Sequence, residues 1–257
     1  MPDYYIGVSA GMAYGLSYLS GQKGRNLELM EKYMADKRYM GMRHLLNRKE
    51  HAYYNTKFVF EEVPNELLPL DYDALARFPG EIEAAVTNIH TGKAEYMTED
   101  HDFDRLMKIC RASSSMPLAA PIANVDGIPY MDGGLADSIP IEYALEKGND
   151  KIVVVLTRNP GYRKKRAIKA TEQLYKRAYK KYPNLVRTIM TRNAVYNKQM
   201  KLIEKLEEEG KIFVIRPLIP TVSRMEKDYD KLQHFYMHGN RLMKKEYQGL
   251  LLSLIHI

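Results

Sequence analysis

The sequence predicts an α/β fold in which helices cover both faces of a mainly parallel sheet. Short apolar runs alternate with helix-like segments from Tyr4 to Leu156, and this order is typical of strands joined by crossover helices. The run Lys151-Ile152-Val153-Val154-Val155-Leu156 is continuously apolar and β-branched, which is typical of a central parallel strand buried on both faces. A third indication is a strand that passes directly into a helix through Gly7-Val8-Ser9-Ala10-Gly11. These patterns do not determine the order of the strands.

The first candidate site lies at Ser9. An apolar run meets the pattern Gly-x-Ser-x-Gly, and the segment that follows, 12–19, reads as a helix. Where a strand turns this sharply into a helix, flanking glycines, here Gly7 and Gly11, let the serine adopt a strained backbone conformation. We therefore predict Ser9 as a nucleophile. The Ala10 amide, at the N-terminus of the helix, is predicted to stabilise an oxyanion.

Most other elements follow from periodicity and turn residues. His90 lies between two β-prone runs, in a hairpin turn where we interpret it as exposed and structural, and Asp126-Gly127 is a tight-turn signal. In the first part of the chain we expect one or two surface helices from Gly24 to Met42, a polar connection from Pro64 to Asp73 and a short helix from Tyr72 to Phe78. Next we expect strands from Glu81 to Ile89 and Lys93 to Met97, a helix from Asp102 to Ser114 and two strands within Pro121 to Met131. The remaining expected elements are a short helix from Glu142 to Lys147, a strand from Lys211 to Ile215 and a closing helix from Arg224 to Leu252.

A carboxylate that could act as the base for Ser9 follows a short strand later in the chain. Ile128 to Met131 reads as a short strand that stops at Asp132-Gly133-Gly134, and paired glycines allow a sharp turn and the close approach of another segment. Alone, Asp-Gly-Gly is more often only a turn. Together with the serine pattern, it makes Asp132 the candidate base.

These two stretches carry a family resemblance. Gly7-Val8-Ser9-Ala10-Gly11 with Asp132-Gly133-Gly134 resembles the Ser-Asp dyad of the patatin-like phospholipases, a group of acyl hydrolases. Further similarities are the central strand and Thr-Gly turn at Ala85 to Gly92, the segment before the aspartate at Arg111 to Pro117, and the later proline in Ile139-Pro140. The resemblance extends from Tyr5 to about Leu156 and continues more weakly into a bacterial-type helical region.

The resemblance implies a three-layer α/β/α patatin-like fold with a mainly parallel central sheet and a C-terminal helical extension. It implies a lipid ester hydrolase with Ser9 as nucleophile and Asp132 as base, acting through an acyl-enzyme. The expected substrate is a phospholipid or another acyl ester, and no cofactor and no metal are expected. Head-group and acyl-chain preference, and oligomeric state, leave no signature in the sequence.

One departure from the family concerns the oxyanion hole. The family normally has a strand and a Gly-Gly-Gly-x-Arg-Gly loop upstream of the serine, whereas this sequence has no residues there, and neither Gly21-Gln22-Lys23-Gly24 nor Gly133-Gly134 replaces the loop. We therefore expect an N-terminally truncated domain over residues 1–160, a basic helical region over 161–250, and a non-native tail over 251–257 that resembles sequencing-adapter read-through. Whether the chain is active without the loop stays open.

The formal net charge of +7 comes largely from one region. Arg163-Lys164-Lys165-Arg166, Lys176-Arg177 and Lys180-Lys181 are expected on helices with apolar residues on the opposite side. A solvated face is the ordinary interpretation, and contact with anionic phospholipid headgroups is the functional alternative. Nucleic acid is not expected as a partner because no reading motif accompanies the charge.

Composition limits the remaining possibilities. The chain of 257 residues is 45% hydrophobic and contains 1 Cys, so we expect a full core, no intramolecular disulfide, and Cys110 as a packed core thiol. No signal peptide or membrane-spanning run is recognised, so we expect a cytoplasmic protein, with peripheral membrane contact or a lost targeting segment as alternatives. His234 and His238 share a helix face without further metal ligands. Rival functions are a Ser-His-Asp esterase using either histidine, a non-catalytic binder of anionic membranes, and a catalytically incomplete fragment.

Overall fold

The computed structural model describes residues 1–46, 52–99 and 101–256. Contacts divide the chain into two compact units: unit 1 comprises Met1–Ile139 and Arg166–Val195, and unit 2 comprises Pro140–Lys165 and Tyr196–Ile257. Unit 1 therefore takes a segment from beyond the expected domain boundary near residue 160. That boundary stays a prediction, because a division by contacts does not test independent folding.

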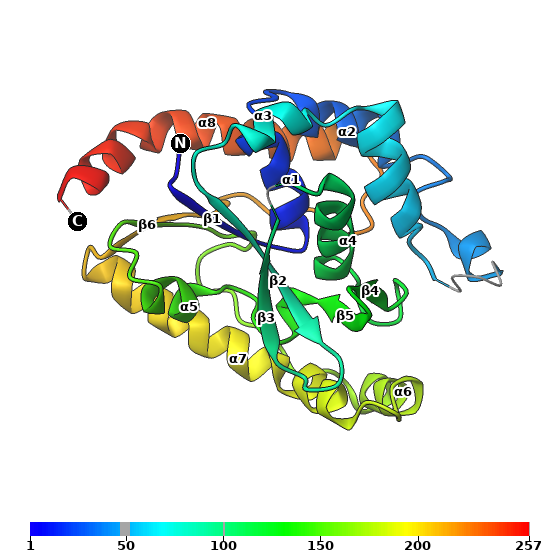
Figure 1. Ribbon diagram of the computed structural model, residues 1–257. Helices are drawn as coiled ribbons and strands as arrows, with labels where there is room; N and C mark the ends of the chain where they lie inside the picture. The colour runs from blue at the N-terminus through cyan, green and yellow to red at the C-terminus, as the bar shows by residue number, and fades with distance from the viewer. Residues whose placement is uncertain (47–51, 100, 257) are drawn as a thin grey trace. The chain divides into compact units, whose positions relative to one another are not determined.

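The elements follow the predicted alternation (Figure 1). Unit 1 contains β1 (Tyr4–Val8), α1 (Ala10–Leu19), α2 (Arg25–Tyr33), η1 (Met42–Leu46), η2 (Phe58–Leu67), α3 (Tyr72–Ala76), β2 (Glu81–Asn88), β3 (Ala94–Thr98), α4 (Phe103–Ser113), β4 (Ala123–Val125), β5 (Ile128–Asp132), η3 (Gly133–Leu135), α6 (Lys169–Ala178) and the first part of α7 (Pro183–Glu208). Unit 2 contains α5 (Ile141–Glu146), β6 (Ile152–Val155), the rest of α7, β7 (Ile212–Ile215) and α8 (Tyr229–His256).

The centre of the mixed sheet in unit 1 is β2. One edge of β2 carries β3, antiparallel, and the other edge is shared by β1, which runs parallel to it, and β5, which runs antiparallel. Val8 of β1 lies opposite Ala85, and Asp132 of β5 lies opposite the next residue, Val86. Because β1 and β5 run in opposite directions along one edge, their C-terminal ends meet.

Helices cover both faces of this sheet. Tyr130 of β5 belongs to a core cluster with residues of α1 and α4, including Met12 and Ile109. The next residue, Met131, belongs to a second cluster with Tyr179 and Leu185 at α6 and α7. Successive strand residues point to opposite faces, so β5 lies between two helical layers, and the predicted α/β/α fold class is confirmed.

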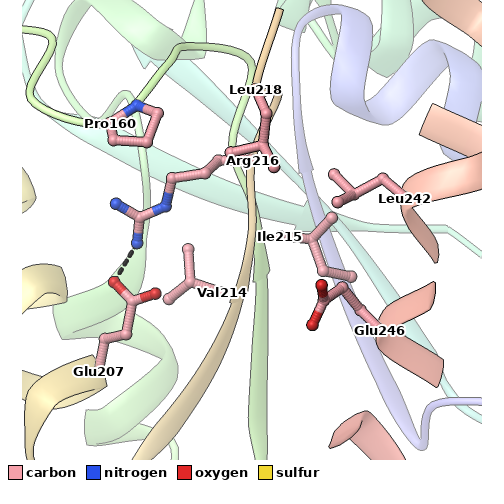
Figure 2. Close-up of a pocket in the computed structure, with 8 residues that line it drawn as sticks. All are labelled: Pro160, Glu207, Val214, Ile215, Arg216, Leu218, Leu242 and Glu246. Carbon is pink, nitrogen blue, oxygen red and sulfur yellow. Dashed lines mark hydrogen bonds and ion pairs between the residues drawn. The ribbon is translucent and has the colours of Figure 1, made fainter. Parts of the chain in front are cut away.

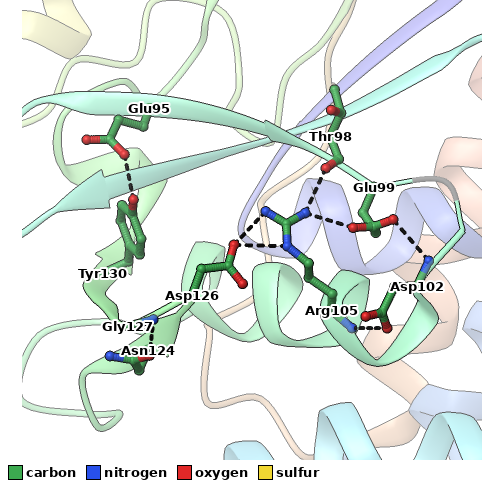
Figure 3. A network of polar contacts seen from close by, with 9 residues as sticks. All are labelled: Glu95, Thr98, Glu99, Asp102, Arg105, Asn124, Asp126, Gly127 and Tyr130. Atoms are coloured by element: carbon green, nitrogen blue, oxygen red, sulfur yellow. Dashed lines mark hydrogen bonds and ion pairs between the residues drawn. The ribbon is translucent and has the colours of Figure 1, made fainter.

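The turn that leads into β5 is held by an arginine network (Figure 3). Asp126 and Gly127 both have positive φ, 52° and 83°, which agrees with the predicted tight turn between β4 and β5. Arg105 of α4 pairs with Asp126 at 2.7 Å and with Glu99 at 2.7 Å. A hydrogen bond from the Asp102 amide, reinforced by Arg105, lowers the pKa of Glu99 to about 2. The network therefore ties the start of α4 to the hairpin that ends at the candidate base.

The strand predicted to be central lies in unit 2 and is only partly covered. β6 pairs in parallel with β7, and no other strand in the described part of the chain pairs with it. Val153 is 39% exposed and Val155 is 70% exposed. The expectation of a strand buried on both faces is therefore wrong, because a β-branched run indicates a strand but tertiary packing decides how many layers cover it.

Two further expectations are wrong. The polar connection expected from Pro64 begins later, because η2 is a π-helix that continues through Pro64 to Leu67. The basic residues were expected on helices, but Arg163 to Arg166 are not helical, and Lys180 and Lys181 lie in the turn between α6 and α7. The Asn197 side chain accepts a hydrogen bond from the Lys164 amide at 2.9 Å and donates one to the Lys164 carbonyl at 3.1 Å, and these bonds hold the basic segment extended along α7.

None of the helices within the described ranges has an apolar stretch long enough to cross a bilayer.

Candidate active site

Ser9 occupies the sharp junction between β1 and α1. Its backbone has φ 54° and ψ −122°, and a positive φ at a non-glycine residue costs of order 1–3 kcal/mol. The Ser9 side chain does not cap α1, although its carbonyl accepts the first helical hydrogen bond, from Ala13, at 3.1 Å. Ala10 is exposed and begins the helix, in the turn whose amides have no intrahelical acceptor.

The two glycines beside Ser9 differ in how closely they are packed. A Cβ atom on Gly7 would lie 2.5 Å from the Cα atom of Met12, whereas a Cβ atom on Gly11 would have nothing within 4 Å. Glycine is therefore required by space at position 7, where strand and helix cross closely. At position 11 the described residues leave open space beside the candidate nucleophile.

A buried serine fixes the backbone of Ser9. The Ser9 amide donates to the Ser113 hydroxyl oxygen at 2.9 Å, and the Ser113 hydroxyl donates to the Ala85 carbonyl at 2.7 Å. Ser113 has no exposed surface and thus bridges β1 to β2 where the two shared-edge strands meet. Sequence reasoning did not assign this role, because only the serine cluster at the end of a helix could have indicated it.

Asp132 is the last residue of β5 and is 2% exposed. One carboxylate oxygen accepts a hydrogen bond from the Gly134 amide at 2.8 Å. The backbone of Asp132 is held by a bond from its amide to the Ser115 carbonyl at 2.9 Å and by the Thr87 hydroxyl, which donates to its carbonyl at 2.8 Å. A Cβ atom on Gly133 would lie 2.0 Å from the Ala85 oxygen, so only glycine allows the turn to pack against β2.

The sheet brings the two predicted site residues to the same place. Val8, which precedes Ser9, and Asp132 lie opposite consecutive residues of β2. No hydrogen bond joins the Ser9 hydroxyl to the Asp132 carboxylate among the residues that the structure describes. In unliganded enzymes such contacts are often long and tighten only when substrate binds. The catalytic roles of Ser9 and Asp132 stay predictions.

Arg192 of α7 also reaches this turn. Its Nε donates to the Gly134 carbonyl at 2.6 Å, and the Ser138 hydroxyl donates to the same carbonyl at 2.6 Å. A Cβ atom built on Gly134 would lie 3.3 Å from Nη2 of Arg192 and 3.0 Å from Oδ1 of Asp132. The guanidinium and the carboxylate therefore share one small space. No sequence motif identified Arg192, because the contact depends on how α7 packs.

Other residues considered from sequence have different surroundings. Cys110 is buried in α4, and burial raises the pKa of its thiol to about 12, so the prediction of a core thiol is confirmed. His90 is exposed in the hairpin turn, as predicted. His234 and His238 lie in α8 of unit 2, where the His238 Nε2 accepts the Leu218 amide at 3.1 Å. Their proposed role as a base stays untested.

The basic segment is largely engaged in intramolecular contacts. Arg163 pairs with Glu204 at 2.5 Å and Arg166 pairs with Glu172 at 2.7 Å. The Lys164 ammonium lies 4.1 Å from the centre of a tyrosine ring. These contacts give three of the four charges an intramolecular partner.

An open pocket of about 300 Å³ lies in unit 2, and none of the predicted site residues lines it. Figure 2 shows the residues that line this pocket. Arg216 and Glu207 form an ion pair at its wall. Its lining consists of Pro160, Glu207, Val214, Ile215, Arg216, Leu218, Leu242 and Glu246.

Comparisons with known proteins give two family matches and a relative. A model of the patatin-like phospholipases matches residues 1–145, and a model described as a domain of unknown function (DUF6363) matches residues 182–254. The chain is similar to the uncharacterized protein YjjU of Escherichia coli strain K12, with 25% identity over 170 residues. That similarity covers 60% of this chain and 43% of YjjU, so the chain spans less than half of that relative's length.

Proposed function

Since the chain belongs to the patatin-like phospholipase family, a group of lipid acyl hydrolases, we propose that it cleaves carboxylic ester bonds of lipids through Ser9 and Asp132. The observation that carries the proposal is the meeting of β1 and β5 on one edge of β2. That arrangement brings together the segments that carry a serine with a strained backbone and a buried carboxylate, which supports their assignment as nucleophile and base.

The proposed reaction has two halves. Asp132 accepts the proton of the Ser9 hydroxyl while the oxygen attacks the ester carbonyl carbon, and the resulting oxyanion accepts a hydrogen bond from the Ala10 amide. The intermediate collapses, the proton passes from Asp132 to the leaving alkoxide, and the acyl group stays on Ser9. Asp132 then takes a proton from water as the water attacks the acyl-serine, which releases the fatty acid and restores the hydroxyl.

The test is labelling of Ser9 by a fluorophosphonate, read by intact mass and peptide mapping, together with hydrolysis of a p-nitrophenyl acyl ester. We expect one adduct on Ser9 in the unmodified chain, none in Ser9→Ala, and a loss of about 100-fold or more in labelling rate in Asp132→Asn, since removal of a catalytic base typically costs 10²–10⁴-fold.

The matched control is Ser114→Ala, which removes a nearby hydroxyl and should label normally. Circular dichroism must show that every variant is folded. Undiminished hydrolysis by Ser9→Ala or Asp132→Asn would remove that residue from the mechanism.

Contact with an anionic bilayer is the second part of the proposal. Ile168 is 71% exposed and lies between Lys165 and Lys169, which are also exposed. An exposed apolar side chain flanked by cations suits a surface of acidic headgroups, where each basic residue contributes about 1 kcal/mol. Cosedimentation with phosphatidylglycerol vesicles should fall in Lys165→Glu/Lys169→Glu, whereas weak binding to phosphatidylcholine vesicles should not change.

A further inference from the structure

The first part of α7 lies in the region matched by the domain of unknown function, and it contacts the candidate active site within unit 1. Three polar side chains spaced four residues apart each donate to a carbonyl of the α/β core. Asn184 donates to His90 at 2.8 Å, Thr188 donates to Gly92 at 2.6 Å, and Arg192 donates to Gly134 at 2.6 Å. Side chains four apart lie on the same helix face, so one stripe of α7 binds two turns of the sheet.

Apolar packing supports the same stripe. Leu185 has no exposed surface and packs in a cluster with Met131 and Leu135. These two residues immediately precede and follow the Asp132-Gly133-Gly134 turn in the chain. The helix is thus anchored on both sides of the turn, and Arg192 meets the turn itself.

The contacts link Arg192 to the carboxylate in two steps. The Gly134 carbonyl accepts the Arg192 Nε, and the Gly134 amide donates to the Asp132 carboxylate. These two groups belong to the two peptide planes that flank the Gly134 Cα atom, so a change in the φ or ψ angle of Gly134 would disturb one or both bonds. A guanidinium has its donors in a fixed planar fork, whereas lysine presents one flexible point charge, so arginine is suited to hold a carbonyl while its terminal nitrogen stays near the carboxylate.

We propose that Arg192 is a positioning residue for Asp132. We also propose that one role of the region matched by the domain of unknown function, residues 182–254, is to hold the Asp132-Gly133-Gly134 turn in place. This inference rests on the proposed function for its consequence in catalysis. The structural part of the proposal, that Arg192 holds the turn in place, can be tested without measuring catalytic activity.

The experiment compares Arg192→Gln and Arg192→Lys with Arg187→Gln in the full chain. Arg187 is an exposed arginine five residues earlier on α7. Hydrogen exchange followed by mass spectrometry reports the peptide that covers residues 132–138, and fluorophosphonate labelling reports Ser9. We expect faster exchange of this peptide and labelling about 10- to 100-fold slower in Arg192→Gln, because a misplaced catalytic group costs rates of this order.

Several outcomes separate positioning from general stability. Arg192→Gly with added guanidinium should regain labelling, whereas Arg187→Gln should resemble the unmodified chain in both readouts. Unchanged exchange in Arg192→Gln would overturn the positioning role, and so would exchange that rises while labelling is unaffected. If the folded unmodified chain is not labelled but exchange still rises in Arg192→Gln, the structural part stands and the proposed hydrolase function fails.

Discussion

At Ser9, a strained φ of 54° must be offset by the contacts around it. The amide of Ser9 has its partner in the buried Ser113, and its carbonyl accepts the Ala13 amide. A single hydroxyl therefore satisfies one donor and one acceptor, Ser9 and Ala85, at the point where pairing of β1 with β2 ends. Without it, the Ser9 amide and the carbonyl of the fully buried Ala85 would each lose this partner.

We predict that Ser113→Ala destabilises the chain by about 1–3 kcal/mol, the range for leaving a buried polar group unpaired, and also slows labelling of Ser9. The comparison is Ser115→Ala, which removes a hydroxyl that lies just beyond α4 and donates to the Arg111 carbonyl of that helix. Urea unfolding measures the difference. Equal losses in the two variants would contradict the role given to Ser113.

The pair of glycines beside Ser9 gives a second prediction at this scale. Gly7→Ala would force a Cβ atom to within 2.5 Å of the Met12 backbone, and overpacking typically costs about 1–3 kcal/mol. Gly11→Ala should be neutral or stabilise by up to about 1 kcal/mol, since alanine is the better helix former. The midpoints of denaturant-induced unfolding measure the stability change in both variants. A stable Gly11→Ala chain that hydrolyses esters slowly would indicate that substrate uses the open space beside residue 11.

At the scale of elements, the shared edge of β2 and the arginine network explain how two distant segments meet. α4 contributes Ser113 at its end and Arg105 near its start, so one helix contacts both the serine junction and the turn before β5. Arg105 pairs with Glu99 and Asp126 on either side of it (Figure 3). The orientation of α4 therefore bears on both halves of the site.

The network predicts a pH dependence of stability. The pKa of Glu99 is lowered from 4.5 to about 2, so its contribution is present above pH 4.5 and is lost as the pH falls toward 2. The unfolding temperature of the unmodified chain should exceed that of Glu99→Gln at pH 7, and the difference should shrink between pH 4.5 and 2. Glu66→Gln, at an exposed position of η2, is the control for loss of a carboxylate outside the network.

Sequence patterns predicted most elements because local signals define them. Asp126-Gly127 has the chemistry of a tight turn, and the apolar period of α4 is that of a helix. They did not predict the π-helix through Pro64 or the extended Arg163 to Arg166, since both depend on packing partners. Ser9 and Asp132 could be singled out because each lies in a glycine pattern, whereas Ser113 and Arg192 have contacts that no local pattern encodes.

At the scale of the whole molecule, unit 1 is discontinuous in sequence. Arg166–Val195 belongs to it and supplies Tyr179 and Leu185 to the core on one face of β5. The face that these residues cover carries Met131 and Ile89, both fully buried. The expected boundary near residue 160 would therefore separate part of a core from its sheet.

A chain cut after residue 160 should accordingly expose this face and lose cooperative unfolding, because uncovering several large apolar side chains removes about 1.5–3 kcal/mol for each. A version in which residues 166–195 follow residue 139 through a flexible linker should recover it. Thermal unfolding and resistance to proteolysis measure both. Cooperative unfolding of the shorter chain at the original temperature would mean that the C-terminal segment is not part of this core.

The meeting of β1 and β5 on β2 also bears on how such a protein can change over evolutionary time. The spacing between the ends of β1 and β5 is set by one peptide step of β2, from Ala85 to Val86, and not by the length of the chain that joins them. Insertions and deletions in the connecting loops leave this step unchanged, while a single residue added within β2 would shift the pairing register by about 3.3 Å and reverse the side-chain faces. Loop length can therefore diverge freely among descendants, whereas the length of β2 cannot.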